Sequence, residues 1–170
     1  MGKNEYKFSV ITYGFQAHVL FDFNDFSSKT DIIEALKQIH GDHSPTYTKL
    51  ALSKAVAVSI AQSTTCGSRL SKASHHTILL YDGLPSDRYS AEEYVNTLNR
   101  LPVYRRPIRS IMTVAVGRAI DHSEMIDISN KPEYTFNLLH FDDIYNKILR
   151  ETSHRDCTGI FSKVESIRIM

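Results

Sequence analysis

The pattern of hydrophobic and polar positions predicts two neighbouring strands, followed by buried strands that alternate with helices. Residues 6–13 ("YKFSVITY") and 17–23 ("AHVLFDF") are rich in β-branched and aromatic side chains, and a turn with Gly14 separates them. This pattern is typical of a β-hairpin. Residues 77–81 and 108–116 are almost continuously apolar, as expected of strands that are buried on both faces. A further short strand is predicted at "YTFNLL".

Helices are predicted between these strands. Ser28 and Asp31 match a capping box, and apolar residues follow them at helical spacing to about His40. Small and apolar residues on one helical face predict a long second helix. A second capping box, at Ser90 and Glu93, predicts the start of a third helix. Shorter patterns predict helices at 121–129 and 141–151. The order of elements predicts an α/β fold, a Rossmann-like three-layer sandwich with a mainly parallel sheet and one antiparallel strand from the hairpin.

Composition narrows the class of protein. The 170 residues are 42% hydrophobic and 23% charged, which suits one globular domain with a sizeable core. A formal net charge of +1 gives no global field that would attract nucleic acid. We expect no membrane insertion, because no apolar run reaches the roughly 20 residues that span a bilayer, and the N-terminus shows no signal peptide. Cys66 and Cys157 could be free thiols or a disulfide.

Motifs for known chemistry are scarce. The chain has no glycine-rich phosphate loop and no nucleophile elbow. His40 and His43 have zinc-like spacing, but no further ligand follows at a usual distance, so a solvated loop is the better interpretation. A cluster of arginines could bind an anion or a sulfated glycan, although a solvated loop with charges near a helix C-terminus is the better interpretation. The cluster consists of Arg100, Arg105, Arg106 and Arg109.

Several segments, in order, resemble the von Willebrand factor A domain. They are "FSVITYG", "VLFDFNDFSSKTDIIEALKQI", "TYTKLAL", "ILLYDG", "MTVAVG" and "EYTFNLLHFDDI". The resemblance predicts a domain over residues 6–151 that is truncated at its N-terminus, followed by a C-terminal tail of residues 152–170. It implies a non-enzymatic module for protein–protein interaction or adhesion, with a protein ligand, in an extracellular setting.

The resemblance also implies a cation site. Members of this family hold a divalent ion, usually Mg²⁺, at the C-terminal edge of the sheet, with oxygens from a D-x-S-x-S motif, a threonine and an aspartate. Thr46 matches the threonine and Asp82 the aspartate. Asp82 could instead cap the loop that follows its strand. D-x-S-x-S is missing, so the site is incomplete, and we expect weak Mg²⁺ binding or none from this chain alone, because the ion needs several oxygens.

The segment that resembles the family begins at the family's second strand, so the opening strand and its helix are missing from it. That strand separates the hairpin from Thr77–Tyr81. We expect the two neighbours to pair directly, or to borrow a strand by self-association through their unpaired edges. We do not expect the tail to fill the gap, because Lys163, Glu165 and Arg168 would be costly on buried faces.

Two other functional hypotheses stay open. A metal-independent scaffold or assembly domain could use the same fold and bind through helix faces or the arginine patch. A small α/β enzyme would need a nucleophile and a base close together, and the sequence indicates none.

Overall fold

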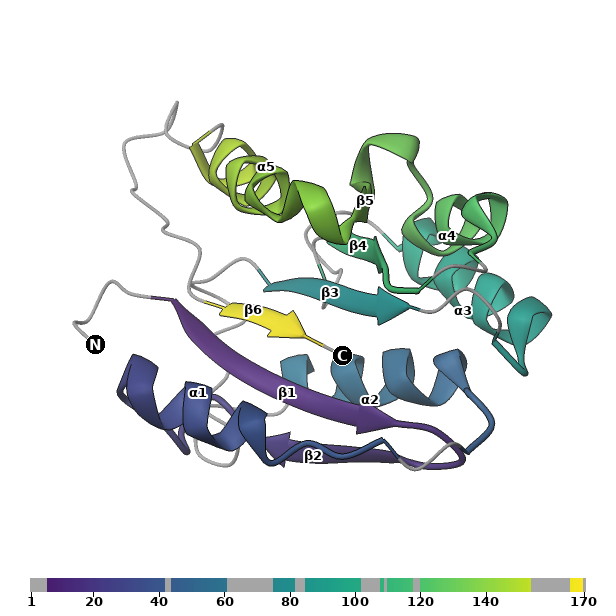
Figure 1. Ribbon diagram of the computed structural model, residues 1–170. Helices are drawn as coiled ribbons and strands as arrows, with labels where there is room; N and C mark the ends of the chain where they lie inside the picture. The colour runs from purple at the N-terminus through teal and green to yellow at the C-terminus, as the bar shows by residue number, and fades with distance from the viewer. Residues whose placement is uncertain are drawn as a thin grey trace.

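The computed structural model describes residues 6–41, 44–60, 75–81, 85–101, 108, 110–117, 120–153 and 166–169. The described elements form a six-stranded sheet between two layers of helices (Figure 1). The strands are β1 (Lys7–Tyr13), β2 (Ala17–Phe21), β3 (His75–Tyr81), β4 (Ser110–Ala115), β5 (Thr135–Asn137) and β6 (Ser166–Ile169). The helices are α1 (Lys29–Lys37), α2 (Thr48–Ile60), α3 (Arg88–Arg100), α4 (His122–Ser129) and α5 (Phe141–Ser153), with short 3-10 turns η2 (Pro132–Tyr134) and η3 (Leu138–His140).

The strand order is β2-β1-β6-β3-β4-β5. Only β2 is antiparallel to its neighbour, and β1, β6, β3, β4 and β5 pair in parallel. The predicted α/β class, with a mainly parallel sheet and an antiparallel strand from the hairpin, is therefore confirmed. No helix among the described residues is long and apolar enough to cross a membrane.

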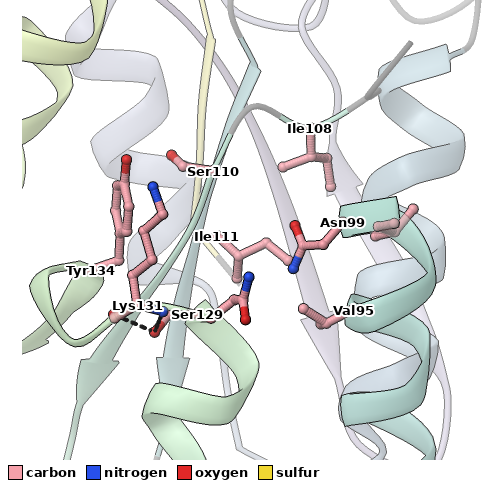
Figure 2. A pocket seen from close by; sticks show the side chains of 10 residues that line it. Val95, Asn99, Ile108, Ser110, Ile111, Ser129, Lys131 and Tyr134 are labelled. Carbon is pink, nitrogen blue, oxygen red and sulfur yellow. Dashed lines mark hydrogen bonds between the residues drawn. The ribbon is translucent and has the colours of Figure 1, made fainter. Parts of the chain in front are cut away.

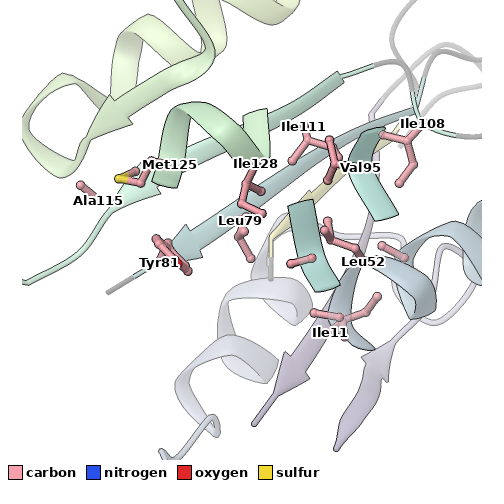
Figure 3. Close-up of a cluster of buried hydrophobic side chains, with 13 residues drawn as sticks. Ile11, Leu52, Leu79, Tyr81, Val95, Ile108, Ile111, Ala115, Met125 and Ile128 are labelled. Carbon is pink, nitrogen blue, oxygen red and sulfur yellow. The ribbon is translucent and has the colours of Figure 1, made fainter. Parts of the chain in front are cut away.

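The larger core cluster lies between the sheet and helices α2, α3 and α4 (Figure 3). Leu52 of α2, Leu79 of β3, Val95 of α3 and Met125 of α4 each have no measurable exposure. Their side chains come from four different elements, so the burial of apolar area ties these helices to the sheet.

A second cluster covers the opposite face, where Ile144 and Ile148 of α5 pack with Ile78, Met112 and Tyr134. Helix α1 also lies on this side, and Figure 1 shows α1 and α2 on opposite sides of β1. The Ser28 hydroxyl caps α1 by accepting from the Asp31 N–H at 3.2 Å, as predicted. Unlike the other long helices, however, α1 has no fully buried residue.

Strand β6 occupies the centre of the sheet, which contradicts our expectation for the tail. Ser166–Ile169 pairs with Lys7–Val10 of β1 on one side and with His75–Ile78 of β3 on the other. The prediction that β1 pairs directly with β3 is therefore wrong. The strand edges that we expected to drive self-association are paired with β6 over these four positions.

Our expectation for the tail was wrong because two of the charged residues that we counted lie outside the strand. The cost that we assigned to Lys163 and Glu165 does not apply within it, because β6 begins at Ser166. Only Arg168 of the three charged residues belongs to the strand. Pairing on both sides satisfies two rows of main-chain groups that would otherwise stay unpaired.

Candidate functional site at the C-terminal edge of the sheet

Three loops meet where the parallel strands end. The turn after β1 contacts the segment before α2, since the Phe15 N–H donates to the Ser44 hydroxyl at 3.1 Å and the Tyr47 N–H donates to the Gly14 carbonyl at 3.2 Å. The loop after β3 contacts the same segment. The Ser86 N–H donates to the Thr46 carbonyl at 2.8 Å, and the Thr46 N–H donates to the Ser86 hydroxyl at 3.2 Å.

Asp87 holds the N-terminus of α2 from another element. Its two carboxylate oxygens accept from the N–H groups of Thr48 and Lys49, both at 2.8 Å. Asp87 precedes α3 in sequence, but its side chain does not cap that helix. A carboxylate at a helix N-terminus satisfies free N–H groups and complements the helix dipole. Asp87 therefore fixes the start of α2 against the β3–α3 loop.

The structure describes only one of the two predicted cation ligands. Thr46 lies half-buried at this edge, directly against Ser86. Asp82 lies outside the described residues, between the end of β3 at Tyr81 and the described loop that begins at Pro85. A shared site for Thr46 and Asp82 thus stays a prediction.

The described residues at this edge do not fit a complete Mg²⁺ shell. Both Asp87 oxygens already accept main-chain N–H groups, and the Ser86 hydroxyl accepts from Thr46. Within the described part of the chain, no group of three or more His, Cys, Asp or Glu side chains could hold a metal ion. A hard cation prefers an octahedron of oxygens, and this donor set is too small for it.

A second charged group lies nearby and was missed by the sequence analysis. Arg88, at the start of α3, lies 3.2 Å from Asp121, 3.4 Å from Asp127 and 4.0 Å from Glu124. All three acids belong to α4 or to its N-cap. Their spacing of three residues puts them on one side of a helix, a signal in the sequence that could have revealed the group.

Glu124 is the buried member of this group, with its side chain 3% exposed. Burial raises the pKa of its carboxyl, while the Tyr81 hydroxyl and Arg88 act in the opposite direction. Hydrogen bonds from Ser123 and from the Glu124 N–H lower the pKa of Asp121. The arrangement ties α3, α4 and the end of β3 together, so a structural role explains it.

Of the predicted arginine patch, the structure describes only Arg100, which is exposed at the end of α3. Arg105, Arg106 and Arg109 lie outside the described residues. A small cavity of about 80 Å³ lies beside this helix end, lined by Asn99, Ile108, Lys131 and others (Figure 2). It has room for a few water molecules, and is much smaller than typical ligand sites.

Comparison with known proteins identifies the family. Residues 1–150 match the model of the von Willebrand factor type A domain, and the chain belongs to this family. A comparison with curated proteins gave no significant match.

Solved structures of proximal thread matrix protein 1 from the mussel byssus are similar to this chain. One, described with a zinc-occupied MIDAS motif, has a TM-score of 0.61 at 24% identity over 88% of this chain. Another has a TM-score of 0.60 at 25% identity, again over 88% of this chain. The match covers 34% and 35% of those two chains, so this chain spans about a third of their length.

Proposed function

We propose that this domain is a non-catalytic module for protein–protein interaction or adhesion, which binds its protein ligand at the C-terminal edge of the sheet. The observation that carries the proposal is the contact of the Thr46 segment with the loop after β3. Ser86 and Asp87 hold that segment through four hydrogen bonds between 2.8 and 3.2 Å. A binding edge that is fixed before the ligand arrives loses less entropy on binding.

The cation contribution at this edge is proposed to be weak. Thr46 and Asp82 would supply two oxygens to Mg²⁺, and a carboxylate of the ligand protein would add another. The similar mussel protein has zinc at its MIDAS motif, so zinc is a second ion to test. That protein is a matrix protein, which supports an extracellular setting for this domain as part of the proposal.

A metal-independent scaffold is the second candidate function. It is favoured by the engagement of both Asp87 oxygens with main-chain N–H groups, which leaves them poorly placed for an ion. Exposed apolar side chains on α1 and α5, namely Ile33, Tyr145 and Leu149, offer helix faces for such contacts. The arginine patch is the alternative surface.

Thermal melting during titration with Mg²⁺ or Zn²⁺ separates the two candidates, because an ion that binds only the folded state raises the melting temperature as its concentration rises. A cation-assisted edge predicts a small rise at millimolar Mg²⁺ that Asp82→Ala abolishes. The matched control, Asp142→Ala in the exposed first turn of α5, should keep the rise. No rise with either ion, in the wild type or in either variant, would favour the scaffold.

A further inference from the structure

We propose that strand β2 binds an extended segment of a partner protein, which adds a strand to the edge of the sheet and carries lysine or arginine at its amino end. The strand order begins with β2, so Ala17–Phe21 pairs with β1 on one side only. Figure 1 shows β2 at this margin of the sheet. The inference goes beyond the proposed function, because it uses neither the Thr46 edge nor a cation.

The outer side of β2 offers main-chain hydrogen bonds. An edge strand presents N–H and C=O groups that no neighbouring strand pairs. Besides its pairing with β1, this strand accepts one hydrogen bond in the described part of the chain, from the Ser9 hydroxyl to the Phe21 carbonyl at 3.0 Å. Ser9 itself belongs to β1. The outward groups of β2 therefore have no partner among the described residues.

Strand β2 lacks most features that protect an edge strand from pairing. Its five residues, "AHVLF", include no proline and no charged side chain. At the opposite edge, β5 has only three residues and contacts both α4 and α5. A bulge shifts the register of β2 between Val10 and Ile11 and bends the strand. We therefore expect a short added segment, at the more open of the two edges.

Apolar side chains of β2 are exposed on both faces of the sheet. Val19 is 36% exposed and pairs with Ile11, which packs in one cluster with Leu52 of α2. Leu20 is 41% exposed and lies on the other face, where it lines a groove with Leu36 of α1. Successive side chains of an added strand would point to the two faces in turn. Uncharged side chains on the added segment therefore fit both faces.

The charges at the two ends of β2 set the direction of the added segment. Asp22 and Asp25 follow the strand, and their carboxylates accept only main-chain N–H groups, from Asn24 at 2.8 Å and from Asp22 at 2.7 Å. Residues 14–16, at the other end, carry no charge. Antiparallel pairing is the more stable kind, and it brings the amino end of the added segment beside Asp22. Lysine or arginine at that end would complement the two acids.

These features select a foreign extended segment rather than a second copy of this chain. In strand addition, main-chain hydrogen bonds supply affinity and alternate side chains supply specificity. A second β2 in antiparallel pairing would put the uncharged residues 14–16 beside Asp22. It would therefore lack the charge that complements Asp22 and Asp25.

Two labelled synthetic peptides with blocked ends test the direction. Both consist of alternating valine and threonine, with lysines at the amino end of one and at the carboxyl end of the other. Fluorescence anisotropy at low salt should show about threefold tighter binding of the amino-end peptide, the effect expected of a surface ion pair. The double variant Asp22→Asn with Asp25→Asn keeps hydrogen-bond acceptors and should abolish this difference.

Two single variants test the strand itself. Leu20→Lys puts a charge on the edge strand and should weaken the binding of the amino-end peptide about tenfold or more. The matched control is Leu139→Lys, because Leu139 is 91% exposed and follows β5 at the opposite edge of the sheet. This control should leave binding unchanged.

Amide hydrogen exchange in the wild-type chain locates the peptide without any variant. The proposal predicts slower exchange of the outward amides of Ala17–Phe21 when the amino-end peptide is bound. It is wrong if neither peptide binds, if the two peptides bind equally well, if both lysine variants weaken binding equally, or if exchange in β2 is unchanged. A dimer of the free chain that already protects these amides would also overturn it, because the occupant would then be a second copy.

Discussion

The hydroxyl of Tyr13 on β1 donates a hydrogen bond to the main-chain carbonyl of Leu80 on β3, at 3.3 Å. The two residues are 67 positions apart in sequence, and their strands are separated by β6 over the first four positions. This hydrogen bond links β1 and β3 directly, in addition to the pairing of both strands with β6.

Tyr13→Phe should lower the free energy of unfolding by about 1 kcal/mol, because the Leu80 carbonyl loses a partner in a partly buried position. Urea denaturation measures the change. The control is Tyr89→Phe, since Tyr89 is 84% exposed, and it should change stability little. Equal effects of the two substitutions would show that the bridge does not stabilise the fold.

Asp87→Ala should cost about 1–2 kcal/mol, the usual effect of losing a helix cap, because the N–H groups of Thr48 and Lys49 lose their acceptor. Asp87→Asn keeps one side-chain oxygen and should cost less. Denaturant unfolding of both variants, compared with Glu93→Ala on the exposed side of α3, checks the prediction. An Asp87→Ala variant as stable as Glu93→Ala would contradict it.

The buried carboxyl of Glu124 should make the free energy of unfolding depend on pH. Burial raises the pKa of its carboxyl above the ordinary value of 4.5, so the protonated form is favoured in the folded state. The stability that this group contributes is full below pH 4.5 and is lost as the pH rises through the folded pKa. Asp121 and Asp127 also face Arg88. A substitution of Glu124 alone leaves these two acids in the sequence.

Glu124→Gln removes this titration. The free energy of unfolding of the wild type, relative to the variant, should therefore decrease as the pH is raised from about 4 to 8. Urea unfolding at a series of pH values measures the difference. The lowered pKa of Asp121 acts with the opposite sign, because its contribution is lost as the pH falls, but it is common to both proteins. A difference that increases with pH would show that the ion pair with Arg88 outweighs burial.

Deletion of residues 166–170 should destabilise the domain by about 3 kcal/mol or more, because it removes hydrogen bonds on both sides of a strand and each contributes about 1 kcal/mol. It also leaves Lys7–Val10 and His75–Ile78 as open edges, so the variant should associate as its concentration rises. Urea unfolding and sedimentation measure the two effects. Deletion of Met170 alone keeps every pair of β6 and is the control. A monomeric deletion variant with unchanged stability would contradict this role of β6.

Much of the fold was predictable because it depends on local patterns. The β-branched run of β1, the apolar run of β3 and the capping pair Ser28–Asp31 each report on their own neighbourhood, and the structure confirms all three. The capping box at Ser90 is wrong, since α3 begins at Arg88. A local pattern could not show that Asp87 turns to the start of α2, because that contact joins residues 38 and 39 positions apart.

The centre of the sheet was not predictable in the same way. The position of β6 depends on pairing with two strands that are distant in sequence, and hydrophobicity of the tail alone does not reveal it. Counting the charges of Lys163 and Glu165 led to the wrong conclusion, because they precede the strand.

Amide hydrogen exchange at Ile167, Arg168 and Ile169 in the full chain tests most directly whether the domain completes its sheet with its own C-terminal strand. Strand β6 pairs on both sides, so its bonded amides should exchange as slowly as that of Thr113 in β4, which also lies between two strands, and the chain should sediment as a monomer. Exchange of all three amides at the rate of an unstructured peptide, while Val10 and Ile78 stay protected, would contradict the account.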